Sequence, residues 1–166
     1  MDAYGTDQGF TDWLASQGLQ LPVDAPSVSV LRHIGSGYID AAYEHALQCS
    51  HRTGGFNQLL AWPRTGHVMN RQTVPNDLIP QAWINASYRA AYLQATEPGW
   101  ATGGVNPDRI TKREKIDVIE REFFSAEDSK TTAVAAGMPA DAVINGMVLP
   151  WLCSSERSLD NLFMVI

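Results

Sequence analysis

Histidine and cysteine are the residues of this sequence that could bind a metal ion. Two of the histidines, His45 and His51, lie close to Cys49, and a helix would place His45 and Cys49 on one face. A structural zinc ion needs four ligands, and no second pair of ligands follows at the spacing that zinc sites use. The remaining histidines are His33 and His67. The sequence therefore predicts no metal site.

No motif for catalysis or nucleotide binding occurs in the chain. The patterns GxxxxGK(S/T), GxGxxG, GxSxG and HExxH are all missing, which leaves no phosphate cradle, dinucleotide fingerprint, nucleophile elbow or zincin helix. The carboxylates of residues 114–122 alternate with basic residues, which is typical of a solvated or salt-bridged surface. We therefore expect a protein that is not an enzyme and that uses no cofactor.

Opposite charges alternate through residues 109–124. The segment has the β-branched residues and the alternation of two strands, 109–116 and 118–124, which meet near Asp117. Three roles are open for this segment, and the mixed charge ranks them: an exposed surface hairpin first, a contact with another protein second and a nucleic-acid contact last. Nucleic acid comes last because phosphate binding requires one sign of charge. We predict a charged β-hairpin whose partner-binding residues are Arg109, Lys112, Arg113, Lys115, Glu120 and Arg121.

Trp62 stands where the chain must bend. Pro63 fixes its own φ and disfavours helical geometry at Trp62, and Thr65-Gly66 supply a turn just beyond. Helix-periodic sequence lies on both sides, so we predict that Trp62, Pro63 and Arg64 form a structural anchor in the groove between two helices. The alternative is that Trp62 stacks on a ligand while Arg64 pairs with an anion.

Capping residues and apolar periodicity predict three helices in the first hundred residues. The first helix begins near Thr6 or Asp7 and ends at Gly18. The second begins with Asp24 as its cap and Pro26 in its first turn. The third covers residues 80–95 and starts at a proline.

The second helix, over residues 26–47, contains two glycines. Gly35 and Gly37 should each cost about 1 kcal/mol relative to alanine in a helix interior. Such a cost is tolerated where a glycine permits close contact, so we expect a close helix crossing or a bend at this point.

The pattern changes at the Gly/Pro-rich segment 102–107. The hairpin follows, then a short helix within residues 139–152 with Val143, Met147 and Leu152 facing inward, then an apolar, β-prone tail from residue 159. An unpaired apolar strand invites aggregation, so the tail must pair with its own hairpin or with another chain. Its predicted partner-binding residues are Leu162, Phe163, Met164, Val165 and Ile166.

These elements predict a mainly α protein: a small helical bundle with an extended β-hairpin arm and a C-terminal helix plus a strand-like tail. Residues 1–100 would form the helical body, and residues 101–166 the arm and the C-terminal segment, in one continuous structural unit. Cys49 and Cys153 are distant in the sequence, have no CxxC partner and follow no signal peptide, which favours a reducing compartment where no disulfide is needed. No apolar run is long enough to suggest a membrane span.

Charge and aromatic placement argue against nucleic-acid binding. The chain has 12 basic and 18 acidic residues and a formal net charge of −6, whereas affinity for phosphates comes largely from Lys and Arg. Binding to single strands requires a basic groove with exposed aromatic residues. The aromatics on predicted core faces are Trp13, Trp62, Trp83 and Tyr88.

Spaced motifs over residues 5–124 resemble a phage protein family. The motifs are Tyr38-Ile-Asp-Ala-Ala-Tyr43, Leu60-Ala-Trp-Pro-Arg-Thr-Gly66, Val74-Pro75 leading to Ile79-Pro80, and Lys112-Arg-Glu-Lys-Ile116. They are similar to the head-to-tail adaptor or connector (head completion) proteins of tailed bacteriophages, some of which carry the label DnaT-like single-stranded DNA-binding protein. The Ala-Trp-Pro-Arg-Thr-Gly string is the most specific of them, and Tyr38 and Tyr43 join the structural anchor residues.

The resemblance implies a virion structural protein that forms a ring with itself, expected to be a dodecamer, beneath the portal of the phage head. Its implied partners are the portal protein and tail or stopper proteins, and DNA would pass through its channel without sequence-specific binding. It would act in the virion neck and be assembled in the host cytoplasm, with no membrane contact. The alternative is a single-stranded DNA-binding protein of phage replication.

Overall fold

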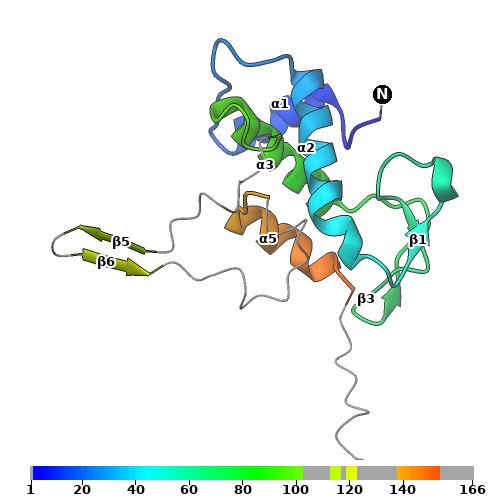
Figure 1. The fold of residues 1–166 in the computed structure, drawn as a ribbon. Coiled ribbons are helices and arrows are strands. Elements are labelled where there is room, and N and C mark those ends of the chain that lie inside the picture. The colour runs from blue at the N-terminus through cyan, green and yellow to red at the C-terminus, as the bar shows by residue number, and fades with distance from the viewer. Residues whose placement is uncertain (1, 103–112, 117–118, 123–137, 154–166) are drawn as a thin grey trace, which may run out of the picture.

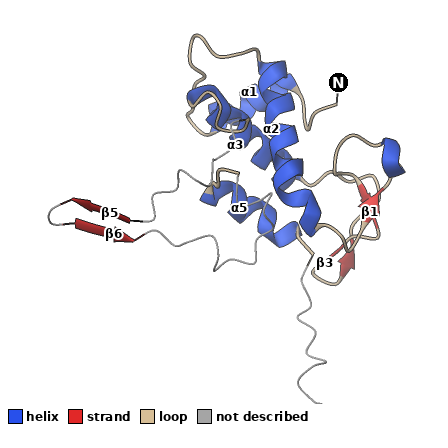
Figure 2. Ribbon diagram, in the orientation of Figure 1, coloured by secondary structure: helices blue, strands red, loops and turns tan. Residues whose placement is uncertain are grey.

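The computed structural model describes residues 2–102, 113–116, 119–122 and 138–153. Within these residues the protein is mainly α-helical, which confirms the predicted fold class (Figure 1, Figure 2). The α-helices are α1 (Asp7–Ser16), α2 (Val28–Tyr43), α3 (Gln81–Thr96) and α5 (Ala142–Val148). Short 3-10 helices are η1 (Glu44–Ala46), η2 (Gly55–Asn57) and η5 (Leu149–Trp151).

The strands are short and pair locally. Each described sheet has two antiparallel strands, and Figure 2 shows the labelled strands β1 and β3 beside the C-terminal end of α2. Residues 68–73 form a small hairpin, whose turn uses Asn70 and Arg71 at positive φ. The pairs are β1 (His51–Arg52) with β2 (Arg64–Thr65), β3 (Val68–Met69) with β4 (Gln72–Thr73), and β5 (Arg113–Ile116) with β6 (Ile119–Glu122).

The β5–β6 pair confirms the predicted hairpin over the residues that the structure describes. Its register places Arg113 opposite Glu122, and Lys115 opposite Glu120. The remaining predicted partner-binding residues, Arg109, Lys112 and residues 162–166, lie outside the described residues.

The structure confirms the predicted ends of the first helix but not the predicted start of the second. The Thr6 hydroxyl accepts a hydrogen bond from the Gly9 amide at 2.9 Å, and the chain leaves α1 through Gly18 at φ +66°, both as predicted. The start predicted for the second helix at Asp24 and Pro26 is wrong. The Ala25 amide donates to the carbonyl of Pro22 at 3.1 Å, so this segment is a turn and α2 begins only at residue 28.

Close packing of α2 on α3 forms the centre of the helical body. Gly35 lies at this crossing, as predicted, whereas Gly37 is exposed and no atom would meet a side chain there. The helix continues through both glycines. A second apolar cluster packs α1 against the other two helices, with Phe10, Leu14, Leu31, Tyr88, Ala91 and Ala95 buried.

The C-terminal helix α5 packs against α3 (Figure 1). Asp141 caps it by accepting hydrogen bonds from the amides of Val143 and Ile144, and Ile144 and Val148 are buried one turn apart. The predicted inward position of Val143 is therefore wrong: its side chain is 53% exposed. Met147 and Leu152 are partly buried against the core. No helix in the described part of the chain is long and apolar enough to cross a bilayer.

Tyrosines of α2 hold the C-terminal segment. The Tyr38 hydroxyl donates to the carbonyl of Pro139, and the Tyr43 hydroxyl donates to the side-chain oxygen of Asn145. Burial raises the pKa of both phenols, so they stay protonated donors.

Candidate functional site

An open groove of about 880 Å³ lies beside the C-terminal end of α2. One wall comes from α2 and η1, with Glu44 and His45, and the other from the segment that carries His51, Arg52 and Phe56. We call this hollow the α2 groove. Among the described residues, its lining comes from the helical body alone, without the β5–β6 hairpin.

Phe56 lies at the α2 groove with its side chain fully exposed. The preceding Gly55 has φ +66°, which starts η2 and turns the chain outward. An exposed aromatic ring beside a groove offers a flat apolar surface to a planar ligand. Phe56 was not among the predicted site residues, although its position directly after Gly54-Gly55 was a usable signal.

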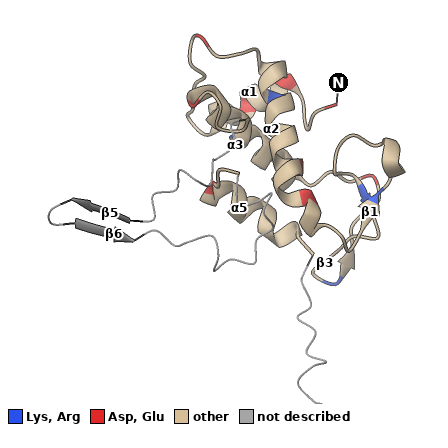
Figure 3. Cartoon of the chain, viewed as in Figure 1, with Lys and Arg blue, Asp and Glu red and all other residues tan. Residues whose placement is uncertain are grey.

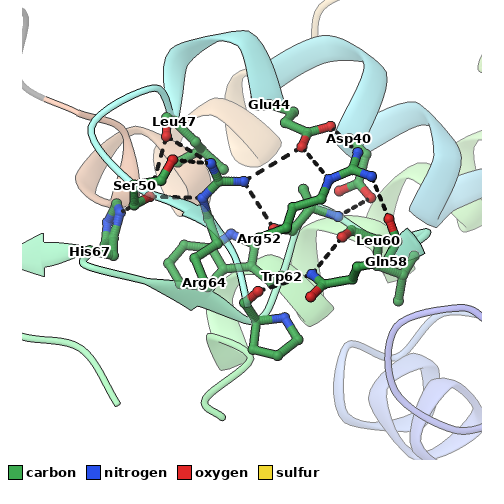
Figure 4. Close-up of polar contacts among 12 residues, drawn as sticks. Asp40, Glu44, Leu47, Ser50, Arg52, Gln58, Leu60, Trp62, Arg64 and His67 are labelled. Carbon is green, nitrogen blue, oxygen red and sulfur yellow. Dashed lines mark hydrogen bonds and ion pairs between the residues drawn. The ribbon is translucent and has the colours of Figure 1, made fainter. Parts of the chain in front are cut away.

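A bidentate ion pair forms part of the groove wall (Figure 4). Arg52 donates from Nε and Nη2 to the two carboxylate oxygens of Glu44, both at 2.6 Å. The hydrogen bond from Arg52 holds the pKa of Glu44 below its usual range. Because the fork geometry orients the guanidinium, Arg52 presents a positioned cation rather than a mobile one.

Arg64 is buried, and its donors are engaged with the segment that follows η1 and with Ala61. Its Nη2 donates to the carbonyl of Leu47 at 2.9 Å, its Nε donates to Ser50 Oγ at 2.8 Å, and its Nη1 donates to the carbonyl of Ala61 at 3.1 Å (Figure 4). Only 5% of Arg64 is exposed. All of its nitrogen atoms donate to acceptors within the protein, so none remains to bind an anion.

Asp40 joins the N-terminus, α2, the Trp62 segment and α3. Its Oδ1 accepts hydrogen bonds from the Tyr4 hydroxyl at 2.7 Å and from Trp83 Nε1 at 3.1 Å. Its Oδ2 accepts from the Ala61 amide at 2.8 Å, and Tyr4 Oη in turn accepts from the Trp62 amide. Burial raises the pKa of Asp40, against the effect of these donors. The sequence analysis did not single out this carboxylate.

Trp62 has no exposed surface. Its ring meets those of His67, Trp83 and Trp151 edge to face, with centroids 4.9, 6.0 and 5.8 Å away. The peptide bond to Pro63 is cis. The Trp62 ring therefore offers no free face on which a ligand could stack.

Most arginines of the helical body pair with a nearby carboxylate. Figure 3 shows charged residues as separate spots rather than as a continuous basic face. Within residues 2–102, Arg71 is exposed and pairs with no described carboxylate. The other arginines pair as Arg32–Asp7, Arg52–Glu44, Arg64–Glu44 and Arg89–Asp141.

Cys49 and Cys153 form a disulfide, contrary to the expectation that the chain needs none. They are 104 positions apart, but the Cys153 amide donates to the carbonyl of Ala46 at 3.0 Å and so holds the two segments together. Nδ1 of the buried His67 lies 3.8 Å from Cys49 Sγ. Burial, and then the charge of Arg64, lower the pKa of His67 and favour its neutral form. In the sequence the histidines near Cys49 are His45 and His51, and no metal site was predicted from them.

A family model described as "Putative DnaT-like ssDNA binding protein" matches residues 1–164. No curated protein and no solved structure shows a significant match to the chain.

The family match corrects the connector interpretation. The resemblance favoured a portal-binding virion connector of the head-to-tail junction, with single-stranded DNA binding as the alternative. The matched family is described by single-stranded DNA binding, and nothing in the match supports a connector. The physical reason for the error is that the motif around Trp62 is buried, and a buried core does not specify a partner.

Proposed function

The chain belongs to this DnaT-like family, and from that premise we propose that it is a non-catalytic protein that binds single-stranded DNA in the α2 groove. The observation that carries the proposal is the fully exposed ring of Phe56 at the edge of a groove large enough for a nucleotide. Every base has a flat π face, so binding by stacking tolerates any sequence.

The groove also supplies polar contacts suited to a strand. Arg52, held by Glu44, keeps part of its side chain at the surface (28% exposed). The exposed ring of His51 lies in the same wall as Phe56. Such a groove would take a base on Phe56 and a phosphate near Arg52.

The pairing of the arginines sets the expected character of the binding. Affinity from counterion release scales with the number of phosphates neutralised, with a slope of about −0.7 per phosphate for single strands. Since Arg52 and Arg64 both pair with Glu44, we expect a shallow salt dependence and an affinity dominated by stacking.

Fluorescence anisotropy of a labelled oligothymidine, titrated with the full chain at two salt concentrations, tests the proposal. Phe56→Ala should weaken binding by about 1–3 kcal/mol, the usual contribution of a stacked base. Val23→Ala is the matched control, because Val23 is also a fully exposed apolar residue but does not line the groove. Absence of saturable binding, or equal affinity of wild type and Phe56→Ala, would contradict the proposal.

A further inference from the structure

Three metal-binding side chains that are distant in the sequence meet below the end of α2. Ligand atoms of Cys49, His67 and Cys153 all lie within 4.8 Å of one another. In the oxidised chain the two sulfurs are bonded together, so they cannot coordinate a metal. Reduction would release two thiols next to a buried imidazole.

The distances suit a tetrahedral ion. With Zn–S near 2.3 Å and Zn–N near 2.0 Å, tetrahedral geometry separates a nitrogen from a sulfur ligand by about 3.5 Å. Nδ1 of His67 already lies 3.8 Å from Cys49 Sγ. The remaining change is separation of the two sulfurs to about 3.8 Å, the spacing of two thiolates on one zinc. Cys49 is exposed and Cys153 half-buried, so both can rotate, and an ion can enter.

The backbone around the cluster is held by contacts that do not depend on the disulfide. The Cys153 amide bonds the carbonyl of Ala46, and Arg64 binds the carbonyls of Leu47 and Ser50 on either side of Cys49. The two cysteines therefore stay close after reduction.

We propose that reduction of the Cys49–Cys153 disulfide creates a zinc site whose ligands are both thiolates and the imidazole of His67, with water in the fourth position. A dithiol supplies two electrons and two protons: the S–S bond breaks, each sulfur takes a proton, and the dithiol becomes a disulfide. Zn²⁺ then displaces both thiol protons to solvent. This proposal does not rest on the proposed DNA binding.

The test compares oxidised and phosphine-reduced full-length chain, both freed of reductant under anaerobic conditions and titrated with Co²⁺. The reduced chain should bind Co²⁺ at a ratio of one per chain, with thiolate charge-transfer bands and the visible bands of tetrahedral cobalt, and Zn²⁺ should remove them. The oxidised chain should show neither. Cys153→Ser and His67→Asn should each lose the tetrahedral spectrum, with circular dichroism confirming that they are folded.

His51→Asn is the matched control, because His51 is two positions from Cys49 yet outside the cluster, and it should bind Co²⁺ like the wild type. Should His67→Asn or Cys153→Ser fail to fold, the comparison of reduced with oxidised wild type still decides. Equal Co²⁺ binding by the two redox forms, or a reduced form without thiolate bands, would overturn the proposal. Loss of Co²⁺ binding in His51→Asn would also overturn the proposal.

Discussion

Gly35 of α2 lies directly against the backbone of Ser87 in α3. A Cβ atom built on Gly35 would be 2.2 Å from the Ser87 carbonyl oxygen and 2.8 Å from the Ala91 amide nitrogen. Real Cβ atoms do not approach backbone atoms so closely, so the crossing of the two longest helices requires glycine at this position.

Gly35→Ala should therefore destabilise the protein although alanine is the better helix former. Overpacking costs about 1–3 kcal/mol, and here the obstacle is backbone that cannot rotate away. Gly37→Ala, two positions further on and in open space, should stabilise by up to about 1 kcal/mol. Urea denaturation of both variants checks this pair, and a Gly35→Ala variant as stable as the wild type would refute the close crossing.

Trp62→Ala should lower the free energy of unfolding by about 3–5 kcal/mol, because it leaves a cavity in the fully buried cluster with Trp83 and Trp151. Phe56→Ala removes an equally apolar but fully exposed ring and should change stability by less than about 0.5 kcal/mol. Thermal melting distinguishes them. Similar losses for both variants would mean that Phe56 is not free at the groove.

Arg64→Lys should destabilise by about 1–3 kcal/mol even though the charge is kept. Lysine has a compact ammonium group, which cannot reach the carbonyls of both Leu47 and Ala61 and the Ser50 hydroxyl together, and buried acceptors without donors are costly. Arg71→Lys provides the comparison, since Arg71 is exposed and should tolerate the change. Chemical denaturation at neutral pH is the measurement.

Glu44 should make stability depend on pH in the acid range. Its pKa in the folded chain is lowered by Arg52, so its stabilising contribution is present above the unfolded-state pKa and is lost as the pH falls through the folded-state pKa. Asp40 acts in the opposite sense, because burial raises its pKa.

Glu44→Gln should accordingly be less stable than wild type at neutral pH, and the difference should shrink on acidification. Melting curves of both proteins from neutral to acid pH give that difference directly and cancel the effect of Asp40. Glu97→Gln, at an exposed carboxylate without a described ion pair, should show no such trend. A constant gap between Glu44→Gln and wild type would contradict the role of the Arg52 contact.

Local signals in the sequence were sufficient for several elements. The hydroxyl of Thr6 and the conformational freedom of Gly18 set the ends of α1, and charge alternation with β-branched residues indicated the hairpin of β5 and β6. These signals act over one helical turn or one strand pair, so they can be read without knowing the rest of the fold. The mainly α fold class follows from apolar residues that recur at helical spacing along the chain.

The sequence by itself determined the mainly α fold class and the charged hairpin, because these depend on residues that are close together in the chain. Only the tertiary structure decided which side chains meet. It placed Phe56 in solvent, turned Ile144 rather than Val143 to the core, set Asp40 among donors from three other segments, and brought Cys153 to Cys49. Each of these outcomes depends on how α2, α3 and the C-terminal segment pack together, and packing between distant segments leaves no periodic trace along the chain.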